Sequence, residues 1–102
     1  MLPQTPSEEF EAELNRVVTR LRSMPLDKIQ ATTEVFLKLS EELLNCSTAL
    51  NDASPVPLPE IEARAYGDVI AVLAADVKHA CTDETQLIPA TLALTTARRA
   101  LP

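Results

Sequence analysis

Apolar side chains recur along the chain at the spacing of one face of an α-helix, and the first such run has a clear start. Thr5, Pro6 and Glu8 form a capping-box pattern, with Thr at the N-cap, Pro in the first turn and Glu three residues after the cap. The stripe that follows has spacings of four, three and four residues and consists of Phe10, Leu14, Val17 and Leu21. The pair Met24-Pro25 predicts the end of this helix, because the residue before a proline is disfavoured in the α region.

A second helical pattern extends from about Pro25 to about Leu50. Low helix propensity between Gln30 and Thr33 makes this the place where the helix would break. The main stripe consists of Phe36, Leu39, Leu43, Cys46 and Leu50. A second stripe lies about 140° around the helix and consists of Leu37, Leu44 and the methyl group of Thr48. Two apolar faces exceed what one helix-helix contact needs, so this helix is either central to the fold or shared with another subunit.

The stretch NDASPVPLP, residues 51–59, predicts a linker, because its three prolines forbid helix and favour a stiff, extended chain. After it, a third helix is predicted from about Glu60 to Cys81. Its stripe consists of Tyr66, Ile70, Leu73, Val77 and Cys81. A fourth helix is predicted from about Gln86 to Ala100. Its stripe consists of Leu87, Ala90, Leu94, Ala97 and Leu101.

Together these patterns predict an all-α protein, an antiparallel four-helix bundle in an up-down arrangement. Residues 1–102 are expected to form a single domain, made of two helical hairpins joined by the Pro-rich linker at 51–59. No segment alternates with the period of a strand, and one glycine against eight prolines argues against the Gly-rich turns of an all-β protein. The one glycine, Gly67, costs about 1 kcal/mol relative to alanine inside a helix, so we expect another backbone to pass close to it.

Charge and hydropathy narrow the classes of partner. The net charge is −6, and an acidic surface repels phosphate backbones, so we expect no nucleic-acid partner. No run of 18 apolar residues occurs, so we expect no membrane span. The N-terminal segment MLPQTPSEEF is acidic and carries prolines, unlike a signal peptide, and a cytoplasmic location is therefore predicted.

The cysteines and the single histidine offer little metal or redox chemistry. Cys46 and Cys81 form no CxxC motif and are expected to be small buried apolar side chains, without a disulfide. Asp76 and His79 stand three residues apart on one helical face, a spacing that metal sites use. Because His79 is the only histidine, a surface pair near the end of the helix is the interpretation that we prefer.

The stretch KLSEELLNC, from Lys38 to Cys46, places two adjacent carboxylates in the middle of a helix. Glu41 lies opposite the main apolar stripe and Glu42 flanks it. Lys38 stands three and four residues before them, within reach of either carboxylate. A solvated charged face accounts for this pattern, and we therefore predict that Glu41 and Glu42 are solvent-exposed residues rather than metal ligands.

The segments LKLSEELLNCSTAL and IEARAYGDVIAVLAADV resemble two helices of the MazG-like nucleoside triphosphate pyrophosphohydrolases, an all-α family. The first resembles the helix with an E-E-x-x-E motif and the second the helix with an E-x-x-D motif. The resemblance covers about residues 37–77 and implies that Glu41, Glu42 and Asp68 would bind Mg²⁺ and a nucleotide triphosphate. The chain departs from both motifs, because Asn45 and Ala65 stand where the family has acidic residues.

No complete set of catalytic, cofactor-binding or metal-binding residues can be assembled from these motifs. The sequence therefore favours a non-catalytic interaction or scaffold protein without a cofactor. We expect a homodimer packed through the segments 25–50 and 60–81, and a further, unidentified protein partner is compatible with this function. The alternative is a MazG-like nucleotide pyrophosphohydrolase with a degenerate Mg²⁺ site.

Overall fold

The computed structural model describes residues 5–50 and 60–102, and this part of the chain is helical and contains no strand. The all-α class is therefore confirmed. The α-helices are α1 (Pro6–Ser23), α2 (Leu26–Gln30), α3 (Thr33–Leu50), α4 (Tyr66–Ala80) and α5 (Ile88–Ala100). Two short 3₁₀ turns, η1 (Ala63–Ala65) and η2 (Glu84–Leu87), directly precede α4 and α5. The predicted linker at 51–59 lies outside the described residues.

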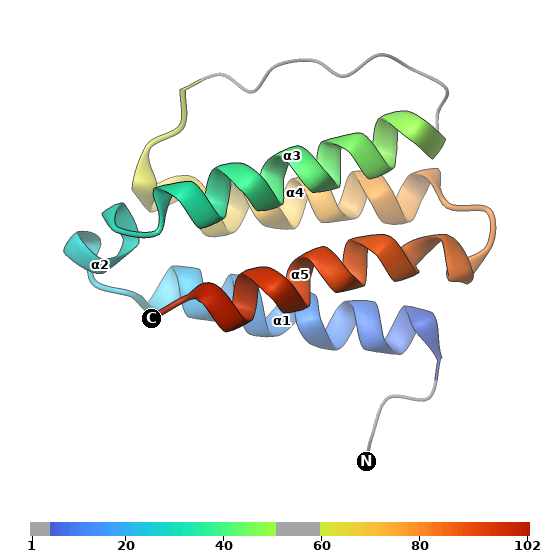
Figure 1. Cartoon of the computed structure of the whole chain (residues 1–102), viewed down its shortest axis with the longest axis horizontal. Coiled ribbons are helices and arrows are strands. Elements are labelled where there is room, and N and C mark those ends of the chain that lie inside the picture. Colours follow the sequence, from blue (N-terminus) through green and yellow to red (C-terminus); the bar gives the residue numbers. More distant parts are fainter. Residues whose placement is uncertain (1–4, 51–59) are drawn as a thin grey trace.

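The four long helices form a bundle in which each helix packs against two others (Figure 1). The packed pairs are α1–α4, α1–α5, α3–α4 and α3–α5, so α1 lies diagonally opposite α3, and α4 lies diagonally opposite α5. Figure 1 shows that α3 and α4 run in the same direction, and that α1 and α5 both run in the opposite direction. The strictly antiparallel, up-down arrangement and the two packed hairpins expected from the sequence therefore do not describe this bundle.

The connecting elements give the physical reason for this difference. Tight loops of a few residues join helices that are antiparallel neighbours, whereas a step to the diagonal position needs more chain. Between α1 and α3 the extra chain includes α2, and between α4 and α5 it includes η2. The sequence analysis counted residues 25–30 as part of one long helix, and so it lacked this step.

Local signals fix most of the helix ends where the sequence places them. The hydroxyl of Thr5 accepts a hydrogen bond from the backbone N–H of Glu8, which caps α1 as predicted, and α1 ends before Met24. The predicted break near Gln30 is also present. There the Thr32 hydroxyl donates to the carbonyl of Ile29 at 2.6 Å, and α3 starts at the next residue. The third helix begins later than predicted, at Tyr66, because a 3₁₀ turn takes up the preceding three residues.

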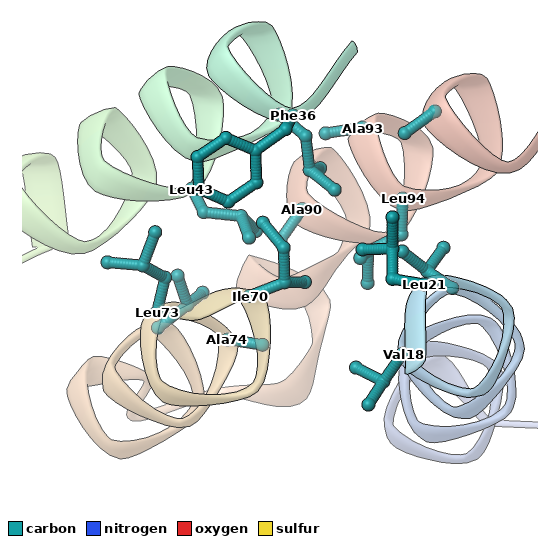
Figure 2. Close-up of a cluster of buried hydrophobic side chains, with 14 of the residues drawn as sticks. Val18, Leu21, Phe36, Leu43, Ile70, Leu73, Ala74, Ala90, Ala93 and Leu94 are labelled. Atoms are coloured by element: carbon teal, nitrogen blue, oxygen red, sulfur yellow. The ribbon is translucent and has the colours of Figure 1, made fainter. Parts of the chain in front are cut away.

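The core is mainly aliphatic, with three aromatic side chains, and is formed by the inward stripes of all four long helices (Figure 2). The predicted stripe residues that are buried include Phe10, Val17, Leu21, Phe36, Leu39, Leu43, Tyr66, Ile70, Leu73, Val77, Leu87, Ala90, Leu94 and Ala97. The rings of Phe36 and Tyr66 stack with centroids 3.8 Å apart, which joins the first turns of the parallel helices α3 and α4.

Small residues let the helices approach closely. A Cβ atom at Gly67 would lie 2.9 Å from Cγ of Arg22 and 3.5 Å from the carbonyl oxygen of Val18, both on α1. The predicted close approach at this glycine is therefore present, between α4 and α1. The second stripe of α3 has a different environment, since Leu37 is 52% exposed and Leu44 is half-buried.

Replacement of Leu43 by alanine tests which stripe of α3 faces the core. Leu43 is fully buried, so Leu43→Ala should lower the free energy of unfolding by about 2–5 kcal/mol. The matched control is Leu37→Ala on the exposed stripe, which should change it by less than about 0.5 kcal/mol. Urea denaturation at one fixed protein concentration measures both values. Equal losses in the two variants would contradict this assignment of the stripes.

Candidate functional site

An open groove of about 620 Å³ runs between the C-terminal halves of α1 and α5. Its lining residues are mostly polar and are Asn15, Arg16, Thr19, Arg20, Ser23, Arg98 and Leu101. The groove gathers three arginines because α1 and α5 are parallel neighbours, and basic residues in both helices stand near the C-terminal ends, where they compensate the helix dipole.

Arg98, one of the residues that line this groove, forms an ion pair with Glu13 that joins the two helices. Glu13 of α1 is only 7% exposed. The Nε atom of Arg98 on α5 lies 2.7 Å from Oε2 of Glu13, and Nη2 of Arg98 lies 3.3 Å from Oε1. This is the two-pronged geometry that a guanidinium forms with a carboxylate. A longer contact of 3.5 Å joins Glu13 to Arg16, one turn later on α1.

The electrostatic surroundings of Glu13 favour its charged form. Burial alone would raise the pKa of Glu13. Hydrogen bonds from Arg98 and Thr95, together with the positive charges of Arg98 and Arg16, outweigh burial and hold the pKa of this carboxyl below its ordinary value. The same hydrogen bond from Arg98 to Glu13 raises the pKa of Arg98. Both side chains are therefore charged at neutral pH.

The groove can attract carboxylates of a partner. Glu13 neutralises Arg98, whereas the side chain of Arg16 is 57% exposed and meets Glu13 only at 3.5 Å. Arg20 is exposed and donates a hydrogen bond to the carbonyl oxygen of Pro102. On a chain whose net charge is −6, this local excess of positive charge is a feature that the overall composition does not indicate.

The carboxylates implied by the MazG-like resemblance are not brought together. Glu41 is exposed on α3, and Glu42 lies beside α5 at a small surface depression. Asp68 of α4 accepts hydrogen bonds of 3.1 and 2.7 Å from Arg22 of α1, the helix diagonally opposite α3. The carboxylate of Asp68 is thus engaged in a contact between two helices.

Within residues 5–50 and 60–102, no three His, Cys, Asp or Glu side chains are grouped so that they could hold a metal ion. Glu41, Glu42 and Asp68 therefore do not fit a shared Mg²⁺ ion in this arrangement. Asp76 and His79, the other pair at metal-site spacing, are both exposed on α4.

The two cysteines are free thiols and are only partly buried, whereas the sequence predicts small buried apolar side chains. Burial raises the pKa of the Cys46 thiol, and the nearby charge of Glu42 raises it further. Burial also raises the pKa of Cys81. Both thiols are therefore protonated at neutral pH and are poor nucleophiles.

Glu13, the buried partner of Arg98, is not among the candidate residues identified from the sequence. The signal was nevertheless present, because Glu13 stands three residues after Phe10 and four before Val17, both of which are fully buried. A charge at a position with core spacing needs a partner, and Arg98, 85 residues later, could not be found from local spacing.

Acid titration of a Glu13→Gln variant tests the ion pair. Because the pKa of Glu13 is lowered in the folded state, its stabilising effect is complete above the ordinary value of 4.5 and is lost as the pH falls through the lower, folded value. At pH 7 the variant should lose about 1–3 kcal/mol of unfolding free energy, and this deficit should shrink below about pH 4.5. Urea denaturation between pH 7 and pH 3 measures it, with Glu9→Gln, an exposed residue of α1, as the control. A deficit that does not change with pH would contradict the proposed charge state.

Comparison of the chain with models of known families gives no match, and comparisons with curated proteins and with solved structures give no significant match either. The resemblance to MazG-like pyrophosphohydrolases therefore stays a prediction from the motif residues alone. What the chain does has to be inferred from its own side chains and their arrangement.

Proposed function

We propose that this chain is a non-catalytic interaction module that works through contacts between proteins and is itself a homodimer. The observation that carries this proposal is a pair of large aliphatic side chains on the outer face of α5. Ile88 is 55% exposed and Leu92, one turn later, is 66% exposed. Adjacent exposed aliphatic residues on a helix favour association more than the same residues scattered singly over the surface.

The use of the charged groups supports the same proposal. Three ion pairs join α1 to its neighbours and are Glu13–Arg98, Asp68–Arg22 and Glu11–Lys78. These carboxylates serve the packing of the helices, and a group of metal ligands is absent from residues 5–50 and 60–102. A scaffold needs no more than this, whereas phosphoryl chemistry with Mg²⁺ needs several convergent oxygen ligands.

A cytoplasmic location without a nucleic-acid or membrane partner is part of the proposal. Both cysteines are free, which suits a reducing compartment, and the net charge of −6 disfavours polyanions. Among the described helices, none combines the length and the apolar character that crossing a bilayer requires.

The competing hypothesis is a nucleotide pyrophosphohydrolase that uses Glu41, Glu42 and Asp68, and a thermal-shift screen separates the two. With nucleoside triphosphates and Mg²⁺ we expect no change in the melting temperature. A ligand at a hundred times its dissociation constant would add about 2.7 kcal/mol of stability, which such a screen detects.

The decisive variant replaces both Glu41 and Glu42 by glutamine, with Glu34→Gln on the same exposed side of α3 as the control. The double variant should fold with nearly unchanged stability, because exposed ion pairs contribute only about 0.2–1 kcal/mol. A nucleotide- and Mg²⁺-dependent rise in melting temperature that the double variant loses and the control retains would overturn the proposed function in favour of the enzyme.

A further inference from the structure

We infer that the second copy of this chain packs on the surface formed by α1 and α5, with the helices of the two copies antiparallel. This inference rests on the proposed homodimer and gives it a surface and an orientation. A second copy fits this surface because a two-fold rotation brings the negative end of the surface on one copy onto the positive end on the other copy.

The surface, here called the α1–α5 face, consists of two outward stripes at helical spacing. The stripe of α1 has spacings of three, four, three and four residues and consists of Glu9, Ala12, Arg16, Thr19 and Ser23. The stripe of α5 has spacings of four, three and four residues and consists of Ile88, Leu92, Thr95 and Arg99. The contact of Ser7 with Glu84 and that of Glu13 with Arg98 place the two stripes side by side.

Charge changes sign along this face. At one end lie exposed carboxylates, Glu9 of α1 and Glu84 just before α5. The middle is apolar, where Leu92 has two thirds of its surface exposed. At the other end lie Arg16 and Arg99, both exposed, beside the groove described above.

The parallel direction of α1 and α5 explains this order. Acidic residues stand at the positive N-terminal end of α1 and in η2, the 3₁₀ turn that directly precedes α5, and both helices carry basic residues in the last turn, at the negative C-terminal end. Side by side in the same direction, the two helices add their acidic ends together and their basic ends together. If the two helices were antiparallel, acidic and basic residues would stand together at each end of the face.

Opposite charges of the two copies meet if a two-fold axis lies between two such faces and is perpendicular to the helices. It sets α1 on α1 and α5 on α5 of the second copy in opposite directions. Leu92 then meets Leu92, and Glu9 of each copy faces Arg16 of the other. The alternative axis, parallel to the helices, would set acid on acid and arginine on arginine, which is repulsive.

The outer side of α3 and α4 lacks this complementarity. It also exposes aliphatic residues, since Leu37 is 52% and Val72 is 60% exposed. The exposed charges around them, however, are mainly acidic, with Glu34, Glu41 and Asp76 against Lys38. A second copy placed there would bring negative charges together, and so we assign the dimer contact to the α1–α5 face rather than to the segments expected from the sequence.

Sedimentation equilibrium of the full chain tests this inference through the dissociation constant of the dimer. At about 0.1 M salt the wild type should sediment at twice the 11.1 kDa chain mass. At about 1 M salt the dimer should be weaker, because the screening length falls from about 10 Å to about 3 Å. Leu92→Glu should raise the dissociation constant about tenfold or more. Leu37→Glu, which makes an exposed leucine acidic on the other side of the bundle, should leave it unchanged. Circular dichroism checks that each variant is folded.

A charge reversal tests the orientation. Arg16→Glu should weaken the dimer. Adding Glu9→Arg to the same chain should restore the dissociation constant towards the wild-type value, because position 9 of each copy faces position 16 of the other copy. If instead the double variant is as weak as the single one, the antiparallel orientation is wrong.

The possible failures can be told apart. If Leu37→Glu dissociates the dimer and Leu92→Glu does not, the homodimer stands and the α1–α5 face is wrong. If the wild type sediments at 11.1 kDa at both salt concentrations, both the homodimer and this inference are overturned. Failure of the non-catalytic function would appear separately, as nucleotide- and Mg²⁺-dependent stabilisation.

Discussion

The ion pair between Glu13 and Arg98 is the interaction on which the arrangement of the helices depends most. Neighbouring parallel helices place like ends of their dipoles together, which is unfavourable unless charges compensate. A buried carboxylate also needs a partner, since an unpaired charge in an apolar interior is strongly destabilising. Arg98 supplies that partner from the last turn of α5, 85 residues after Glu13. The pair thereby fixes which helix lies beside α1 and how the two are aligned along their axes.

The same pairing shapes the surface. Because α1 and α5 lie parallel, the acidic residues at the start of α1 and in η2 gather at one end of the face, and the basic residues at the ends of both helices gather at the other end. Glu13 pairs closely with Arg98, whereas Arg16 meets Glu13 only at 3.5 Å and remains largely exposed. The arrangement that stabilises the fold thus leaves exposed the side chains, such as Arg16, that we propose recognise a second copy. The Arg22–Asp68 pair acts differently, because it engages the carboxylate that the MazG-like resemblance would assign to Mg²⁺.

Periodicity predicted the helices and the core stripes well, because large apolar side chains at helical spacing, such as Leu43 and Ile70, share the face that their helix buries. The exposure of Glu41 also followed from its place opposite the main stripe of α3. The order of the helices around the bundle did not follow, because a local pattern gives the inward face of a helix and not the identity of its neighbour. The groove was missed for the same reason, since Glu13 and Arg98 come together only once α1 and α5 are known to be neighbours.

The measurement that tests this account most directly is a double-mutant cycle on the two partners of the ion pair. Glu13→Gln, Arg98→Met and the combined variant would be compared with the wild type by urea denaturation at pH 7 and one protein concentration. If the pair holds α1 against α5, the two changes should be coupled by about 1–3 kcal/mol, since the second change costs little once the first partner is gone. Effects that add to within about 0.5 kcal/mol would contradict the account, because they would mean that the two side chains stabilise the fold independently.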